Sequence, residues 1–485
     1  MNVKHSLSAS RKLLLALGAV LCAQTVLAQG VARLTGSFTS GEFRAPSEAQ
    51  TLWQAGAEAE GRREWTDLSL HGHFGFTQAY GTGMCGSMFT EPGYYPVDVV
   101  EFTPGSKSRQ TYNIGGGLSW KKLGSWIPGI DTRFRGVNLA KRKDLRHTTY
   151  RQELALSPSL AYEGDGWLAR LSYSFGKTSE FIQAEVVGPP KAESYYAFLD
   201  KGLRYGTYQA WDGSGVHLAE PGVDRFPVNE RSHGVSLEVE APFGLEASFG
   251  ITFGNGEVGE KGYTWFRFPS LQWEGEAAWQ FTAGRYSHRL QAHIGWQSCQ
   301  LYERVIEKVN SGGVTTPSIL GENRVYAERG LEGGISYRLE RKDGLALEVL
   351  ARSEAGNKQS TLMYPFWDLD RATHCHLGLG AEIPLGSFLI KTGGLVSGNI
   401  FGHRHTVDTD DDQLGVSSRP FQLAEWYDME NELDDALHAQ FSLAVRYNFK
   451  PFYLEAGCDW THAFQVEVLP GANRQTTHLV FGYNF

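Results

Sequence analysis

Residues 475–485 read QTTHLVFGYNF, and the spacing within this stretch decides the fold. Leu479, Phe481, Tyr483 and Phe485 occupy alternate positions, and the positions between them hold small or polar residues or a valine. Because successive side chains of a strand point to opposite sides, the segment has one apolar, aromatic-ended face and one mainly small or polar face. Such a strand fits a wall between lipid and water, although the edge strand of a soluble sandwich shows a similar pattern.

The same alternation of apolar and polar residues recurs along the chain, with clear examples at 167–175, 245–253, 437–447 and 452–460. Alternation of this kind is the signal of strands with two unlike faces. Short connections and long, polar, aromatic-rich connections separate the alternating segments. The short ones lie at 61–64, 163–166, 242–244, 282–285, 340–344, 384–387 and 448–451, and the long ones at 78–109, 141–149, 176–232, 254–264, 303–328, 353–372, 398–436 and 465–474.

Short and long connections that take turns are typical of an all-β, antiparallel, up-and-down barrel that spans an outer membrane. We predict about 18 transmembrane strands, with 16 as the alternative, joined by short periplasmic turns and long outer loops. The least regular strands are the first, near 31–39, and the one at 130–140, where the alternation shifts after Gly136.

The N-terminus predicts a signal peptide. Basic residues precede an apolar run at 13–21, and Val-Leu-Ala at 26–28 provides small-residue cleavage chemistry. The run is too short to span a bilayer as a helix. We therefore expect residues 1–28 to be cleaved and residues 29–485 to form the outer-membrane barrel, which places the protein in a Gram-negative bacterium.

Composition narrows the possible functions. The chain of 485 residues has a formal net charge of −9, which argues against nucleic-acid binding because that requires a basic surface. Ser, His and Asp occur, but no local signature assembles them into a catalytic group. We accordingly identify no catalytic and no cofactor-binding residue, and we do not expect an enzyme.

Three segments carry a family resemblance: GYYPVD at 93–98, KRKDLR at 141–146, and the run 195–208 that contains KGL at 201–203. Together with the strand pattern, they make the chain similar to an uncharacterised family of outer-membrane β-barrels from the Bacteroidota. The resemblance implies the fold and the location, and suggests an association with TonB-dependent uptake receptors. The closing strand of such barrels is read by the barrel-insertion machinery, so Phe481, Tyr483 and Phe485 are the expected insertion signal.

Parity along the strands also predicts which charged side chains face the lumen. Charges are costly against lipid but natural against water, so charged residues within the strands should point inward. The predicted lumen-facing set is Arg133, Arg135, Glu238, Glu240, Arg289, Lys391, Arg446 and Glu455.

Histidine pairs two residues apart raise the possibility of a metal site, because a strand projects both rings to one side. His374 and His376 form one such pair, and imidazole and carboxylate are plausible transition-metal ligands. Water-facing histidines that hydrogen-bond along a polar wall are the simpler interpretation. An EF-hand is rejected for the acidic run at 408–412, because glycine is missing at its sixth position, and weak Ca²⁺ binding remains a possibility. The weak metal candidates are His374, His376, His403, His405, Asp408, Asp410 and Asp412.

A barrel of about 18 strands has a lumen wide enough for water unless loops fill it. The first functional hypothesis is a passive channel for a small polar solute. The alternative is a surface-exposed binding or accessory subunit of an envelope uptake system, with its lumen closed by loops. The connection at 176–232 holds many aromatic residues, which favours a packed lid or constriction over a ligand platform.

Overall fold

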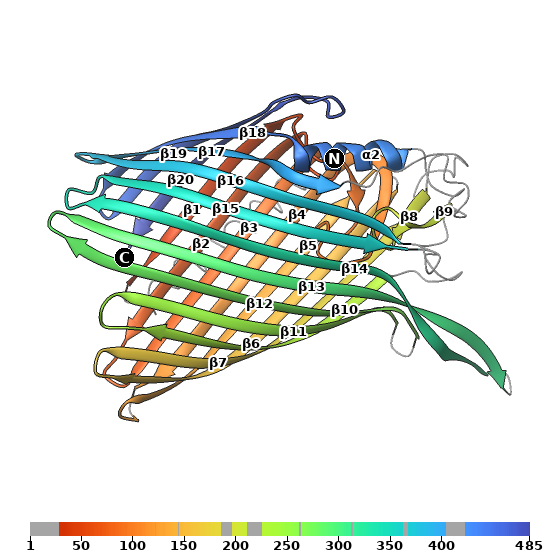
Figure 1. Cartoon of the computed structure of the whole chain (residues 1–485), viewed down its shortest axis with the longest axis horizontal. Helices are drawn as coiled ribbons and strands as arrows, with labels where there is room; N and C mark the ends of the chain where they lie inside the picture. The colour runs from red at the N-terminus through yellow and green to blue at the C-terminus, as the bar shows by residue number, and fades with distance from the viewer. Residues whose placement is uncertain are drawn as a thin grey trace, which may run out of the picture.

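The computed structural model describes residues 29–121, 123–143, 145–185, 196–210, 226–260, 263–311, 314–361, 367–403 and 422–485. In this part of the chain, 18 antiparallel strands close into a barrel, as the sequence predicts (Figure 1). The predicted signal peptide at 1–28 lies outside the described residues. No described helix is long and apolar enough to cross a membrane.

The elements follow in chain order, and β8 and β9 form a hairpin that lies outside the barrel wall proper. The wall consists of β1 (Gln29–Gly41), β2 (Thr51–Glu64), β3 (Leu68–Ser87), β4 (Asp98–Trp120), β5 (Trp126–Lys141), β6 (Arg146–Gly164), β7 (Trp167–Glu185), β10 (Phe226–Glu240), β11 (Leu245–Glu260), β12 (Tyr263–Ala283), β13 (Tyr286–Ser311), β14 (Val314–Arg341), β15 (Ala346–Ser360), β16 (Asp368–Leu385), β17 (Phe388–His403), β18 (His438–Phe449), β19 (Phe452–Ala463) and β20 (Asn473–Asn484). The additional elements are β8 (Tyr196–Asp200), β9 (Gly206–Ala210) and α2 (Gln422–Asp435).

The first and last strands close the barrel. Residues 31–41 of β1 pair in continuous antiparallel register with residues 474–484 of β20. Beyond this ladder, the Phe485 N–H donates to the Gly30 carbonyl at 3.0 Å, and the Gly30 N–H donates back at 2.9 Å. The ring of Phe485 packs against Ala32 and Ala59, where small side chains leave room for it. Closure pairs the backbone groups of both edge strands, which a membrane-spanning sheet requires.

Short connections gather at one end of the barrel, called here the turn end, and long ones at the other, called the loop end (Figure 1). At the turn end, Asp165 and Gly166 join β6 to β7 with φ values of 52° and 79°. Positive φ at both residues is what a two-residue type I′ hairpin needs, and Asp-Gly is a preferred pair for it. The connection between β4 and β5, which the sequence pattern did not predict as a short turn, belongs to the same end.

Several of the predicted long connections are largely strand, with 254–264 and 353–372 among them. The predicted loop 303–328 is a β ribbon in which β13 and β14 remain paired out to Ser311 and Val314, and Figure 1 shows it projecting beyond the loop end. The predicted loop 78–109 shortens to residues 88–97, because β3 and β4 extend past the barrel wall. These segments carry charged and aromatic residues on both faces, so their alternation is hard to recognise in the sequence.

The apparent shift in alternation after Gly136 is not a change of register. β5 pairs continuously with β4 and β6 on either side of that residue. Val137 and Leu139 share the inward side with Arg135, and both are buried although they face the lumen. Apolar side chains on this side of the wall must therefore be covered by other segments inside the barrel, and these segments lie at the loop end.

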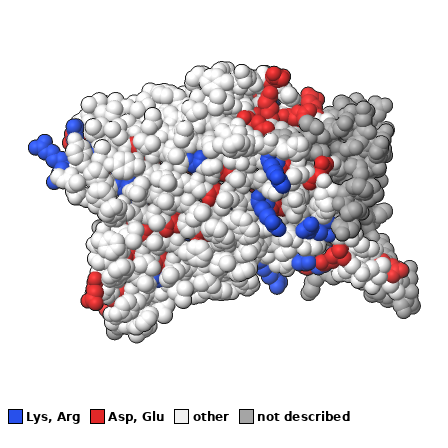
Figure 2. All heavy atoms as spheres, in the orientation of Figure 1, with Lys and Arg blue, Asp and Glu red and all other residues white. Residues whose placement is uncertain are grey.

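The outer face of the wall is apolar. Leu171, Ile335, Leu377 and Leu379 expose 56–68% of their surface, at the strand positions that point away from the lumen. Figure 2 shows one such face largely without charged residues, with the larger charged groups toward the two ends. An apolar surface of this extent on a monomer marks contact with lipid or protein.

Candidate functional site at the loop end

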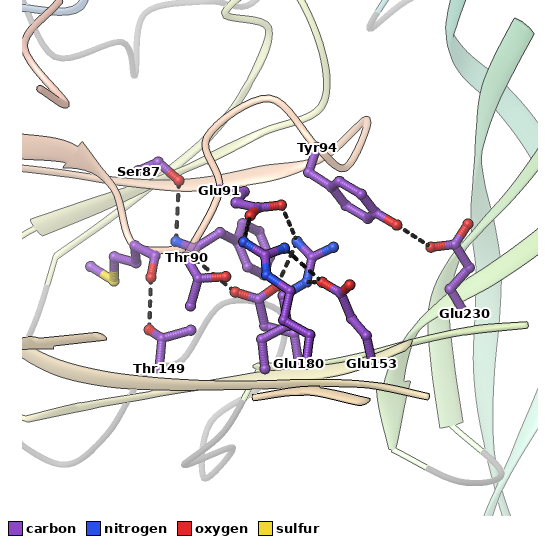
Figure 3. Close-up of polar contacts among 12 residues, drawn as sticks. Ser87, Thr90, Glu91, Tyr94, Thr149, Glu153, Glu180 and Glu230 are labelled. Carbon is purple, nitrogen blue, oxygen red and sulfur yellow. Dashed lines mark hydrogen bonds and ion pairs between the residues drawn. The ribbon is translucent and has the colours of Figure 1, made fainter. Parts of the chain in front are cut away.

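The connection between β3 and β4 folds into the barrel. The Thr90 N–H donates to Glu180 Oε1 at 2.7 Å, and the Thr149 hydroxyl donates to the Met88 carbonyl at 2.7 Å (Figure 3). Phe89 is buried within the same inward segment. Residues 88–97 are thus anchored on the inner side of β6 and β7.

Glu91 at the centre of this connection meets arginines from three adjacent strands. Its carboxylate lies 3.3 Å from Arg109 Nη2 on β4 and 3.1 Å from Arg151 Nη1 on β6, and it also binds Arg135 on β5. Burial by itself raises the pKa of Glu91, but the Arg135 hydrogen bond and the charges of Arg151 and Arg109 outweigh burial and lower it. Glu91 is therefore ionised at neutral pH and ties the loop to the wall.

Further carboxylates complete the cluster around Arg151, which is nearly fully buried. Arg151 Nε lies 2.6 Å from Glu153, and Arg151 Nη1 lies 3.7 Å from Glu180. The Tyr94 ring covers the guanidinium, with its centroid 3.8 Å from Arg151 Cζ, and the Tyr94 hydroxyl donates to Glu230 at 3.2 Å. Figure 3 shows these carboxylates converging on the guanidinium groups from opposite sides.

A second buried ion cluster lies where β4 and β5 leave the wall. Lys141 Nζ is 2.6 Å from Glu101 Oε2, and both side chains are fully buried. Lys107 Nζ lies 3.6 Å from the other carboxylate oxygen and donates to the Ser87 carbonyl at 2.9 Å. Two lysines thus share one glutamate away from water, an arrangement that is stable only while all three groups stay together.

The β8–β9 hairpin continues this structure across the loop end. β8 pairs with residues 98–101 at the start of β4. Burial raises the pKa of Asp98 to about 7, the hydrogen bond from Ser87 opposes this rise, and the neighbouring Asp200 adds to it. Burial also raises the pKa of Asp200, against the opposing charge of Arg204. Asp98 therefore keeps its proton to a higher pH than an ordinary carboxyl does.

The helix α2 lies over the hairpin and reaches to the opposite wall. Leu423 at its start is fully buried against Val100 and Phe198. The Tyr427 hydroxyl donates to Asp370 on β16 at 3.4 Å. At the far end, the Glu432 carboxylate accepts backbone N–H groups of the β19–β20 connection at 2.6–3.1 Å. We call residues 88–97, the β8–β9 hairpin and α2 together the stopper.

A hydrophobic core joins the stopper to the inner wall. Tyr95 packs with its ring centroid 5.7 Å from that of Phe268, and Phe89 lies 6.1 Å from Phe226 by the same measure. The wall side of this core comes from apolar residues at lumen-facing strand positions near the loop end and from one residue of the β5–β6 connection, Leu145. They are Leu145, Ile182, Phe226, Val228, Val258, Phe266, Phe268, Leu301 and Tyr326.

Three cavities of about 260, 330 and 410 Å³ lie around the stopper. The two smaller ones share Glu328, Lys358, Asp370 and Asp434, so they adjoin beneath α2 and are rich in carboxylates. The largest lies on the other side of residues 88–97, against β2 to β5.

Six of the eight predicted lumen-facing residues form ion pairs with side chains of neighbouring strands or of the stopper. Arg446 and Lys391 both contact the Glu455 carboxylate, at 2.7 and 2.8 Å. Glu238 lies 3.2 Å from Arg170. Arg133, Arg135, Glu240 and Arg289 complete the set: Arg135 belongs to the Glu91 cluster, Arg289 pairs with Glu246 at 3.3 Å, and Arg133 and Glu240 are exposed.

Three of the predicted metal candidates, His374, His376 and His403, lie in the described part of the chain. His376 Nδ1 shares a hydrogen bond of 2.8 Å with the Ser397 hydroxyl, whereas His374 Nε2 lies 3.9 Å from Asp435. His403 is exposed. Within the described residues, no three His, Cys, Asp or Glu side chains are arranged to hold a metal ion. His405, Asp408, Asp410 and Asp412 lie outside the described residues.

The stopper residues were not identified from the sequence as a site. The segments 93–98, 141–146 and 201–203 that carry the family resemblance all contribute to the stopper or its contacts, yet they indicate no chemistry by themselves. A usable signal was present: apolar residues such as Val137, Ile182 and Val228 occupy lumen-facing positions near the loop end and are buried there. Apolar residues at lumen-facing positions predict that another segment of the chain packs against the inner wall.

The chain is similar to one protein family and to several solved structures. The family of unknown function DUF6850 matches residues 27–485, and no curated protein matches. Among solved structures, the ferric preacinetobactin receptor BauA of Acinetobacter baumannii is 7% identical, with 94% of this chain and 80% of that chain covered and a TM-score of 0.43. The outer membrane transporter YddB of Escherichia coli is 6% identical, with 95% of this chain and 81% of that chain covered and a TM-score of 0.43. An anion-selective porin of Comamonas acidovorans is 12% identical, with 94% of this chain and 98% of that chain covered and a TM-score of 0.35.

Proposed function

We propose that this chain, which belongs to the family of unknown function DUF6850, is an outer-membrane uptake barrel that its own stopper closes in the resting state. Its turn end would face the periplasm and its loop end the outside. The apolar outer face supports insertion in lipid, because a charge-poor band around a closed barrel is stable only there. Uptake of a small polar solute then requires the stopper to move.

The observation that carries the proposal is the packing of the stopper on the inner wall. Apolar residues such as Ile182, Val228 and Phe268 would be exposed to water in an open lumen, at a cost that their burial removes. Glu91 adds a polar fastening, because three guanidinium groups depend on its carboxylate. A permanently open pore has no need of either feature.

Two alternatives make different use of the same barrel. A passive channel for a small polar solute is favoured by the ion pairs of the turn end, which are half exposed to water along the lumen. An accessory binding subunit, working with an envelope receptor such as a TonB-dependent one, would keep the stopper closed permanently.

Single-channel recording in planar bilayers separates the three. We expect the wild type to open rarely, and Glu91→Lys to conduct steadily, because a fourth cation beside three arginines expels residues 88–97. Glu58→Lys is the matched control, since Glu58 is a half-exposed lumen residue beside Arg33 at the turn end. Steady conductance by the wild type would establish the passive channel instead. Silence from both the wild type and Glu91→Lys would favour the accessory subunit.

A further inference from the structure

The largest cavity at the loop end differs from the other two in its charge. Three cations line it, Lys107 and Arg109 from β4 and Arg474 from β20. The single carboxylate in the lining is Glu48, whose side chain is about half exposed to water. Among the charged residues that line the two cavities beneath α2, carboxylates outnumber cations, so the stopper separates a basic compartment from an acidic one.

Arg109 and Arg474 each have a nitrogen without a hydrogen-bond partner. Arg109 directs Nη2 to Glu91, a carboxylate that it shares with two other arginines, and its Nε is buried without a hydrogen-bond partner. Arg474 donates from Nη2 to the Ala49 carbonyl at 3.4 Å. Its Nη1 is also buried without a hydrogen bond, 3.9 Å from Glu48. With three cations against one half-exposed carboxylate, the lining carries a net positive charge that favours an anionic molecule in the cavity.

The rest of the lining fits an organic molecule better than a simple ion. Leu52, Met84, Phe89 and Leu139 provide apolar surface, and Thr77 and Thr111 are among the polar side chains from β3 and β4. A volume of about 410 Å³ is in the range of small-molecule sites, which combine mostly apolar walls with a few fixed polar groups. Guanidinium groups favour carboxylate and phosphate oxygens in particular.

We propose that this cavity binds a small organic anion, with its carboxylate or phosphate group toward Arg109 and Arg474 and its apolar part toward Leu139 and Met84. The inference rests on the proposed uptake function and names the class of solute. Bound between residues 88–97 and the wall, such a molecule would compete with Glu91 for Arg109. Ligand binding would in this way loosen one of the fastenings of the stopper.

Calorimetric titration of the purified full chain in detergent tests the proposal, with phenyl phosphate as the probe. Benzyl alcohol and benzylamine, which keep the ring but are neutral or cationic, should bind at least tenfold more weakly. Arg474→Gln should weaken phenyl phosphate binding about tenfold or more, the usual effect of losing a charge-assisted hydrogen bond. Leu139→Trp, which fills the cavity without removing a charge, should abolish binding.

Arg289→Gln is the control, because Arg289 is a half-exposed lumen arginine at the turn end, distant in the wall from the cavity. It should bind phenyl phosphate as the wild type does, and heat-modifiable migration should show that every variant is folded. No binding by the wild type, or equal affinity for benzyl alcohol, would overturn the proposal. So would unchanged affinity in Arg474→Gln. These outcomes are independent of conductance, so a wild type that conducts steadily but binds the probe would overturn only the gated uptake.

Discussion

Arg170 and Glu238 at the turn end form the same kind of ion pair as Lys141 and Glu101 at the loop end, but in the opposite environment. The first pair exposes 39% and 49% of its side chains, whereas the second is completely buried. Exposed pairs contribute about 0–1 kcal/mol and tolerate the loss of one partner. Buried pairs leave an uncompensated charge when one partner is removed. An ion pair therefore has different consequences for stability at the two ends of one barrel.

The largest effect should follow from breaking the buried pair. Glu101→Gln leaves Lys141 and Lys107 buried without a counter-charge, and we expect the loop end to lose about 3–5 kcal/mol of local stability. Hydrogen exchange of the β4 and β5 amides near the loop end measures this loss. Glu238→Gln is the matched variant at the turn end, where a change of about 1 kcal/mol or less is expected. Equal losses in the two variants would show that the contrast between the ends is wrong.

A somewhat smaller effect should distinguish the two faces of the wall. Leu443 on β18 points outward and is 44% exposed, so Leu443→Arg should cost about 2–4 kcal/mol if lipid covers it. Arg446→Gln on the same strand should leave the barrel folded, because Lys391 still compensates Glu455. Urea titration of folding into lipid vesicles compares the two. Normal folding of Leu443→Arg would mean that the outer face is not in lipid.

A third effect concerns pH and the stopper. Because the pKa of Asp98 is raised to about 7 in the closed state, the closed state holds a proton that an open, hydrated Asp98 would release at lower pH. Closure should therefore weaken as pH rises from about 4 to about 7, by up to about 1.4 kcal/mol per pH unit, and then level off.

Hydrogen exchange of the β8 amides at pH 5 and pH 7.5, corrected for intrinsic rates, measures this dependence. Asp98→Asn should remove most of it and should protect β8 more than the wild type at pH 7.5. The exposed pairs of the turn end should show no matching change. A stopper that is equally protected at both pH values would exclude Asp98 as the titrating group.

The strand pattern alone predicted the barrel, its strand number and the alternation of short and long connections. The reason is that alternation is a local property: Phe481 and Tyr483 must face one side of β20 whatever the rest of the chain does. The same locality made the sequence misleading at Val137 and Leu139, where apolar residues on the lumen side suggested a shifted strand. Extended ribbons such as 303–311 were read as loops, because two exposed faces leave no alternation to detect.

The sequence by itself thus determined the wall of this protein, and only the tertiary structure decided what fills it. In the sequence, Glu91 is one acidic residue in a polar connection. In the folded protein, it contacts Arg109, Arg135 and Arg151, which come from three different strands. Whether an inward charge is exposed or buried depends on segments far away in the sequence, such as α2 and the β8–β9 hairpin. The two-residue period of a strand shows which side of the wall a side chain faces. Whether that side chain is buried depends on contacts between distant segments, and local spacing in the sequence does not encode these contacts.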